Sequence, residues 1–155
     1  MLYEEGSRAH DIPEESIFKD SDIEFCVVDR AVLYETIEKD LSGAVKRCAC
    51  WFHGRHYLAD GLMSDNRLKE AMDLTNSLFT IEAFAKDMTP EERLAMRKKY
   101  SKKIVDRLFE VLRSFKENES DYGSLVNRGV NYLLDDEAAF RMFLTDGRNL
   151  FTTMQ

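Results

Sequence analysis

Hydrophobic residues near the N-terminus occur in short continuous runs rather than at helical spacing. Residues 23–28 are apolar and rich in β-branched side chains, and residues 45–52 form a second run, so each run predicts a buried strand. Apolar residues at helical spacing follow each run, at residues 31–39 and 53–63, and a helix start is indicated at residues 11–14. This alternation of strand and helix favours a parallel α/β arrangement.

From residue 66 onward the hydrophobic period changes to 3.6, which predicts two long amphipathic helices. The apolar face of the first contains Leu68, Ala71, Leu74, Leu78, Ile81 and Phe84. The second begins at Thr89-Pro90-Glu91-Glu92, which combines a capping Thr, a Pro at the first helical position and a Glu that completes a capping box. Its apolar face contains Tyr100, Ile104, Leu108, Val111, Leu112 and Phe115. Because the connection is short, we expect an antiparallel hairpin.

Two shorter helices are predicted after a loop at residues 118–123, one over residues 125–134 and one around residues 140–144, before Asp146-Gly147. The expected fold class is therefore an α-rich α/β chain in three parts. A strand–helix–strand–helix unit occupies residues 1–63, and an antiparallel helical hairpin with two shorter helices occupies residues 64–148. Residues 149–155 form a tail.

Composition limits the classes of protein that the chain can represent. The 155 residues suit one domain, and 22 basic against 29 acidic residues give a net charge of −7, which argues against a generally basic DNA-coating protein. No apolar run reaches the roughly 20 residues of a membrane helix, and residues 1–5 do not resemble a signal peptide. Three cysteines, an odd number, argue against a disulfide framework, so a cytoplasmic location is expected.

Asp29 is the first residue with a candidate chemical role. It directly follows the predicted strand at residues 23–28, and carboxylates at the carboxyl ends of parallel strands lie where ligands bind. An oxygen-ligated divalent cation would suit this carboxylate. A helix cap is the commoner role of an Asp after a strand, and this interpretation is favoured when Asp29 is considered alone.

A second candidate is a zinc site formed by Cys48, Cys50, His53 and His56. Positions 48 and 50 share a face of a strand, and positions 53 and 56 share a face of the following helix. Two thiolates and two imidazoles are a tetrahedral zinc ligand set. Because this spacing matches no standard zinc motif, and cysteines of an apolar strand are commonly core residues, zinc binding is not expected.

A third candidate is a basic stretch in the second long helix. It contains Arg93, Arg97, Lys98, Lys99, Lys102, Lys103 and Arg107 against Glu91, Glu92 and Asp106, an excess of four positive charges. Such a surface suits DNA phosphates, with Arg97, Lys98 and Lys102 as the candidate contacts. Because no interleaved aromatic residues are expected to stack on bases, a solvated positive helix surface is the favoured interpretation.

Several segments, taken in order, resemble the insertion sequence 66 family of bacterial transposases. Residues 50–55 resemble that family's Cys-Trp-x-His-x-Arg motif, and residues 28–34, with Val28-Asp29 and Tyr34, resemble its Asp-Gly-Tyr-x-x-Tyr motif. Residues 89–97 are similar to its Ser-Pro-Glu-Glu-Arg-Leu-x-x-Arg segment. Residues 131–134 and 143–148 are similar to its Asn-Tyr-x-Leu and Phe-Leu-x-Asp-Gly-Arg segments. The ordered set extends over nearly the whole chain.

The resemblance implies a ribonuclease-H-like core, present here as a partial unit, with an inserted helical region. Such transposases use two aspartates and a glutamate to hold two Mg²⁺ ions, which activate water and then a 3′-hydroxyl for attack on phosphodiester bonds. Asp29 would be the second of these acids and so the Mg²⁺ ligand. His53 would lie beside the cleft, where it could touch the scissile phosphate, and Arg55 could pair with backbone phosphate.

The sequence also departs from the family pattern. The family's first aspartate lies on a strand that would precede Met1, and its third acid follows the segment that ends at Arg148, where residues 149–155 carry no acid. Arg30-Ala31 replaces the family's Gly-Tyr, and a cation so close to Asp29 would compete with Mg²⁺. With two of three metal ligands unmatched, we expect a truncated transposase that does not bind Mg²⁺ or cleave and join DNA by itself.

Three functional hypotheses follow. The first is a fragment or remnant of a DNA transposase, with element-end DNA as its partner. The alternative is a helical protein- or DNA-binding module that modulates an intact transposase. In either case an exposed sheet edge would favour a homodimer or pairing with the intact enzyme. The least favoured hypothesis is a free-standing metal enzyme built around Asp29, Cys50 and His53.

Overall fold

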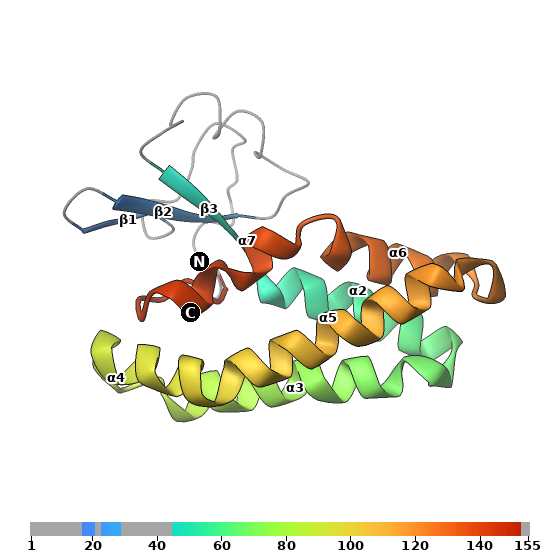
Figure 1. Ribbon diagram of the computed structural model, residues 1–155, viewed down its shortest axis with the longest axis horizontal. Helices are drawn as coiled ribbons and strands as arrows, with labels where there is room; N and C mark the ends of the chain where they lie inside the picture. Colours follow the sequence, from blue (N-terminus) through green and yellow to red (C-terminus); the bar gives the residue numbers. More distant parts are fainter. Residues whose placement is uncertain (1–16, 21–22, 29–44, 153–155) are drawn as a thin grey trace.

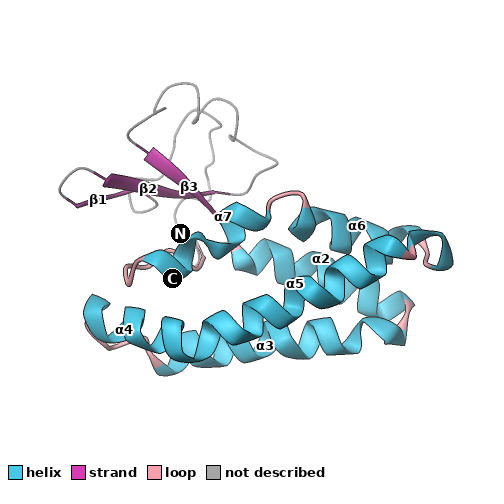
Figure 2. Cartoon of the chain, in the orientation of Figure 1, coloured by secondary structure: helices cyan, strands magenta, loops and turns pink. Residues whose placement is uncertain are grey.

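A computed structural model shows a small sheet beside a larger set of helices (Figures 1 and 2). The structure describes residues 17–20, 23–28 and 45–152. The predicted helix start at residues 11–14, the predicted helix at residues 31–39 and Asp29 all lie outside the described residues. None of the described helices is long and apolar enough to cross a membrane.

The described strands form one sheet of order β1-β2-β3: Ile17–Asp20, Ile23–Val28 and Val45–Ala49. Strands β2 and β3 pair in parallel, with Val28 opposite Ala49, which confirms the predicted strand at residues 23–28 and its parallel partner. Strand β1, which the sequence pattern did not predict, pairs antiparallel with β2. The described residues show this pairing but not a ribonuclease-H-like strand–helix unit, which remains a proposal.

The second predicted strand is shorter than expected. The sequence predicted a strand over residues 45–52, but β3 ends at Ala49 and helix α2 spans Trp51–Ser64. The backbone N–H of Trp51 donates to the carbonyl of Phe151 at 3.0 Å, so one amide left open by the first helical turn finds a partner in the C-terminal segment. The boundary between β3 and α2 therefore involves a contact with a residue 100 positions away, which the local hydrophobic period does not reveal.

The predicted helical hairpin is confirmed. Helix α3 spans Lys69–Phe84, and the second arm consists of α4, Pro90–Met96, a π-helical turn, Arg97–Ser101, and α5, Lys102–Glu117. Helices α3 and α5 run side by side in Figure 1. The expected capping box is present, because the Thr89 hydroxyl accepts from the backbone N–H of Glu92 at 3.2 Å and the Glu92 carboxylate accepts from Thr89 N–H at 3.0 Å.

The π-helical turn changes which residues of the second arm face the core. Arg93, Arg97, Ser101 and Val105 are buried at a spacing of four. In a regular α-helix this spacing drifts by about 40° per step, and a wider turn corrects the drift. The prediction that Tyr100 lies on the buried face was therefore wrong, since its side chain is 45% exposed.

The two shorter helices are also present: α6 spans Ser124–Leu134 and α7 spans Glu137–Arg141, followed by a 3₁₀ turn at Met142–Thr145. Helix α6 packs closely on α2, where a Cβ on Gly129 would come within 2.9 Å of the Tyr57 carbonyl oxygen. One hydrophobic core extends from Cys48 to Phe151 and contains side chains from all three predicted segments.

Candidate nucleic-acid interface and the carboxyl end of the sheet

The carboxyl ends of β2 and β3 lie side by side, because Val28 is paired with Ala49. Residues that follow parallel strands at such an edge are where α/β proteins place ligands. On the β3 side the next residue is Cys50, whose Sγ lies 3.1 Å from the hydroxyl of Thr152. This edge is therefore bordered by the start of α2 and by the C-terminal segment, while Asp29, the residue after β2, lies outside the described residues.

Trp51, the tryptophan of the Cys-Trp-x-His-x-Arg motif, has a role in packing the core. Its side chain is completely buried, and its indole N–H donates to the carbonyl of Phe140 at 3.0 Å. Four aromatic rings surround the indole with centroids 4.9–6.5 Å away: Phe109, Phe140, Phe143 and Phe151. Trp51 thus holds the first turn of α2 against the C-terminal part of the chain.

His53 and Arg55, the two predicted DNA contacts of α2, are half-buried. The His53 ring stands edge-on to Phe52 at 5.6 Å. The Nε of Arg55 donates to the amide oxygen of Asn76 at 2.7 Å, and the guanidinium lies 5.1 Å from the centre of the Phe79 ring. These contacts tie Arg55 to α3, so a phosphate would have to use its remaining donors.

Arg97 is buried rather than placed at the surface, with 1% of its side chain exposed. Its guanidinium binds both carboxylate oxygens of Glu82, at 2.8 and 2.7 Å. It also donates to three backbone carbonyl oxygens of the C-terminal segment, those of Phe143, Asp146 and Arg148. A guanidinium so enclosed does not reach a DNA backbone in this conformation, so the basic surface loses one of its three predicted contacts.

Arg93, one turn earlier, anchors the same segment from the other side. Its guanidinium donates to the carbonyl of Gly147 at 2.6 Å and to those of Ala85, Lys86 and Met88 in the hairpin connection. The chain passes so close to α4 at Gly147 that a Cβ there would lie 1.7 Å from the Pro90 carbonyl oxygen. Residues 89–97 and 143–148, two of the family-like segments, are therefore in direct contact.

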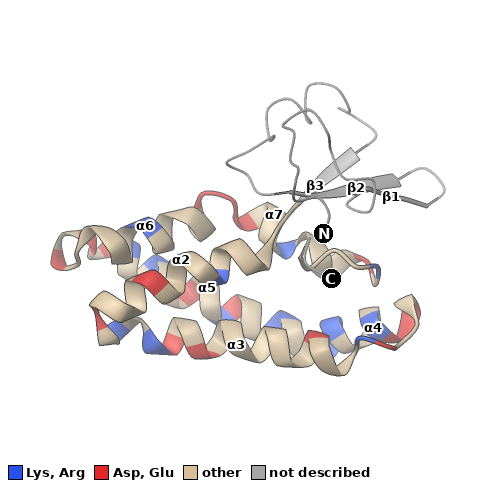
Figure 3. Ribbon diagram, turned by 180° about the vertical axis from the view of Figure 1, so that it is seen from behind, with Lys and Arg blue, Asp and Glu red and all other residues tan. Residues whose placement is uncertain are grey.

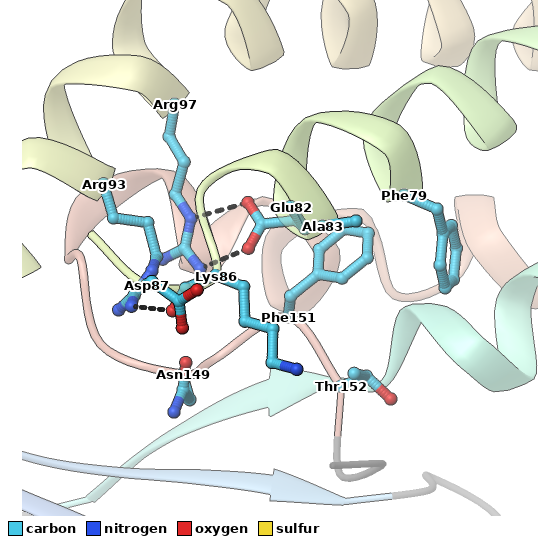
Figure 4. Close-up of a pocket in the computed structure, with 10 residues that line it drawn as sticks. All are labelled: Phe79, Glu82, Ala83, Lys86, Asp87, Arg93, Arg97, Asn149, Phe151 and Thr152. Atoms are coloured by element: carbon cyan, nitrogen blue, oxygen red, sulfur yellow. Dashed lines mark hydrogen bonds and ion pairs between the residues drawn. The ribbon is translucent and has the colours of Figure 1, made fainter.

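A pocket of about 410 Å³ opens beside these arginines (Figure 4). In Figure 4 the ion pair of Glu82 with Arg97 lies at one side of the pocket, and Phe79, Phe151 and Thr152 lie at the other. No feature of the sequence pointed to Glu82 or Thr152, because their partners are 15 and 102 residues away. The pocket connects the arginine cluster with the residues that border the carboxyl end of β3.

The segment at Asp146 is also organised by charge. Burial raises the pKa of Asp146, but hydrogen bonds from the side chain and backbone N–H of Arg148 outweigh this effect and hold that pKa below its usual range. The Arg148 guanidinium binds the carboxylate at 2.9 and 3.0 Å. Asp146 therefore remains ionised at neutral pH and fixes the turn whose carbonyl oxygens Arg93 and Arg97 bind.

The exposed basic stretch is partly neutralised, and basic and acidic residues are interspersed over the helices (Figure 3). Lys102 donates to Asp106 at 2.8 Å, and hydrogen bonds from Lys102 and Arg141 lower the pKa of Asp106. Arg107 pairs with carboxylates as well. Lys98, Lys99 and Lys103 are exposed and form no ion pair with a carboxylate in the described part of the chain. These three lysines remain available to an anionic partner.

The described residues do not fit a two-magnesium site. Mg²⁺ prefers carboxylate oxygens, whereas the start of α2 and the C-terminal segment offer the Cys50 thiol, the His53 imidazole and the Thr152 hydroxyl. Within residues 17–20, 23–28 and 45–152, no group of three or more His, Cys, Asp or Glu is placed to hold a metal ion.

Comparison with known proteins supports the family resemblance of the sequence. No curated protein and no solved structure matches the chain. A model of the IS66 transposase family matches residues 2–153, which include every segment that carries the resemblance. The structure adds that the segment at 143–148 contacts both the segment at 50–55, where Phe143 packs on Trp51, and the segment at 89–97. The chain belongs to the IS66 family of transposases.

Proposed function

We propose that this chain serves as a DNA-binding scaffold of an IS66 transposase. The observation that supports this proposal is the stretch 93–105, which contains no acidic residue in a chain of net charge −7. Within it, Lys98, Lys99 and Lys103 are exposed and lack carboxylate partners among the described residues. Lysines of this kind attract DNA phosphates and release counterions on binding. The expected partner is the DNA of element ends, and the expected location is the cytoplasm.

The 155-residue chain, in this proposal, does not cleave or join DNA by itself. Asp29 is its one residue that matches a catalytic acid of the family, and a two-metal mechanism needs several carboxylates. A ribonuclease-H-like core around β2 and β3 is part of the same proposal, with Asp29 as second acid and His53 and Arg55 near the phosphate. Mg²⁺-dependent nicking by the purified chain, abolished by Asp29→Ala, would overturn this part.

DNA binding is tested by titrating a labelled duplex that carries the element end, at low and high salt. Lys98→Gln with Lys103→Gln should weaken binding and reduce the slope of log affinity against log salt by roughly one per lost phosphate contact. A matched control removes two exposed lysines that already form ion pairs, Lys69→Gln with Lys116→Gln. Equal loss in both double variants would show general electrostatics and would contradict a specific basic surface.

A second candidate function is regulation of an intact transposase by direct pairing. Among the described residues β3 pairs with β2 alone, so the structure shows no strand on its other side. Such an edge is a template for another strand. The measurement is the molar mass of the chain by light scattering, alone and mixed with the full enzyme. A complex of defined stoichiometry without DNA would favour this second function.

A further inference from the structure

An apolar groove of about 570 Å³ lies between α3 and the second arm of the hairpin, on a face where both arms expose large side chains. Phe84, Met96, Tyr100 and Ile104 line it, and Lys103 stands at its rim. Phe84 is 73% exposed although the helical period assigned it, like Tyr100, to the buried face. Two aromatic side chains expected in the core are thus displayed together at the surface.

The backbone accounts for the position of Tyr100. Tyr100 lies in the π-helical turn Arg97–Ser101, where Arg97 and Ser101 take the inward positions. Such turns are frequent at functional sites, since they alter the direction of a side chain at a cost in helix regularity. Here the turn serves the burial of Arg97, and the consequence is that Tyr100 points out of the core beside the groove.

The charge around the groove selects the kind of ligand. The ammonium of Lys99 lies 5.2 Å from the centre of the Tyr100 ring, and Lys103 is among the residues that line the groove. Neither lysine has a carboxylate partner among the described residues. Apolar, aromatic walls beside cations suit a flat group that stacks through its π-face and carries negative charge beside it, which is the chemistry of a nucleotide.

We propose that this groove binds unpaired bases of DNA, with a base stacked on Tyr100 and Phe84 and its phosphates near Lys99 and Lys103. The bases must be unpaired because in a duplex each face is already covered by the neighbouring pair. Stacking on aromatic side chains is independent of sequence, since every base has a π-face. The inference rests on the proposed DNA-binding function and names the form of DNA that this surface selects.

The test compares two fluorescein-labelled probes by anisotropy, an oligothymidylate and a blunt duplex of the same length. The variants are Tyr100→Ala, Phe84→Ala and the conservative Tyr100→Phe, with Met63→Ala as control at an exposed apolar residue of α2. Because the altered side chains are at the surface, with Tyr100 45% and Phe84 73% exposed, the variants are expected to fold, which circular dichroism verifies. Light scattering of wild type and Phe84→Ala is measured in parallel.

Tyr100→Ala should weaken single-strand binding roughly 5- to 160-fold, the range for loss of one stacked base. Duplex binding should change less than about twofold, and Tyr100→Phe and Met63→Ala should behave like wild type.

Equal loss for both probes, or no single-strand binding by wild type, would overturn the inference. A wild-type dimer that Phe84→Ala converts to a monomer would also overturn it, because the groove would then be an interface between copies. If wild type binds neither probe, the proposed function fails too, whereas duplex binding alone leaves that function standing.

Discussion

The guanidinium of Arg97 donates a 2.6 Å hydrogen bond to the carbonyl oxygen of Asp146, 49 residues later in the chain. The same guanidinium holds both carboxylate oxygens of Glu82, so one side chain joins α3, the π-helical turn and the C-terminal segment. The family-like segments 89–97 and 143–148 therefore have a structural role in common. They fix the segment that runs back to the start of α2.

Arg97→Ala should lower the free energy of unfolding by about 3–5 kcal/mol. The substitution leaves the carboxylate of Glu82 without its bidentate partner and removes the Arg97 donor from three carbonyl oxygens, and breaking a buried ion pair by removing one partner costs that much. Urea denaturation followed by circular dichroism measures the change. The neighbouring Lys98→Ala, at an exposed position, should cost less than about 0.5 kcal/mol. A loss below about 1 kcal/mol for Arg97→Ala would show that the contacts of Arg97 with Glu82 and the C-terminal segment contribute little to stability.

Gly147→Ala tests the close contact between the C-terminal segment and α4. A Cβ at this position would lie 1.7 Å from the Pro90 carbonyl oxygen, so the backbone of one segment has to move. Forced repacking of this kind costs about 1–3 kcal/mol, and here part of the Arg93 contact with Gly147 should be lost as well. Thermal unfolding gives the measurement, with Gly123→Ala as the matched control, since nothing lies within 4 Å of a Cβ there. Similar melting temperatures for both variants would contradict the described contact.

The sequence was sufficient where one local pattern determined the structure. The capping box at Thr89 and the hydrophobic period of α5 needed no distant information, and both are present as predicted. The length of the second strand was wrong because the start of α2 depends on a hydrogen bond from Trp51 to Phe151. Strand β1 was missed because four residues carry too little periodicity.

The candidate site was harder to predict because an arginine expected at the surface is buried and two aromatic residues expected in the core are exposed. Arg97 was assigned to a DNA-binding surface, since a lone arginine is normally excluded from a core by its desolvation cost. Its burial is offset by Glu82, 15 residues earlier, and by carbonyl oxygens that only the tertiary fold supplies. In the π-helical turn Arg97 takes an inward position and Tyr100 an outward one, although the spacing of Tyr100 placed it in the core. Phe84, at the end of α3, is also exposed although its spacing placed it in the core.

Stability should fall in acid partly through Asp146. Its pKa in the folded state is lowered, because hydrogen bonds from Arg148 outweigh the opposing effect of burial. The ionised carboxylate therefore contributes stability that is fully present above its usual pKa of 3.8 and is lost as pH falls through the lower folded value. Asp146→Asn should cost about 1–2 kcal/mol at neutral pH and give a shallower decline in acid, measured by urea denaturation across pH. The exposed Asp135→Asn is the control, and an unchanged decline in Asp146→Asn would refute the assignment.

Trp51 provides a test of the core at the junction of sheet and helices. It is the one tryptophan of the sequence, and its complete burial predicts blue-shifted emission that moves to longer wavelength on unfolding. Trp51→Phe keeps an aromatic ring but removes the donor to the Phe140 carbonyl, so we expect a loss of about 1–3 kcal/mol in denaturation followed by circular dichroism. Phe52→Ala, at the adjacent exposed position, should cost less than about 0.5 kcal/mol.

Red-shifted emission in the native chain, or equal losses for the two variants, would mean that α2 does not begin at Trp51 against the C-terminal segment. The contact between Cys50 and Thr152, on which the arrangement at the carboxyl end of the sheet depends, would then be lost too.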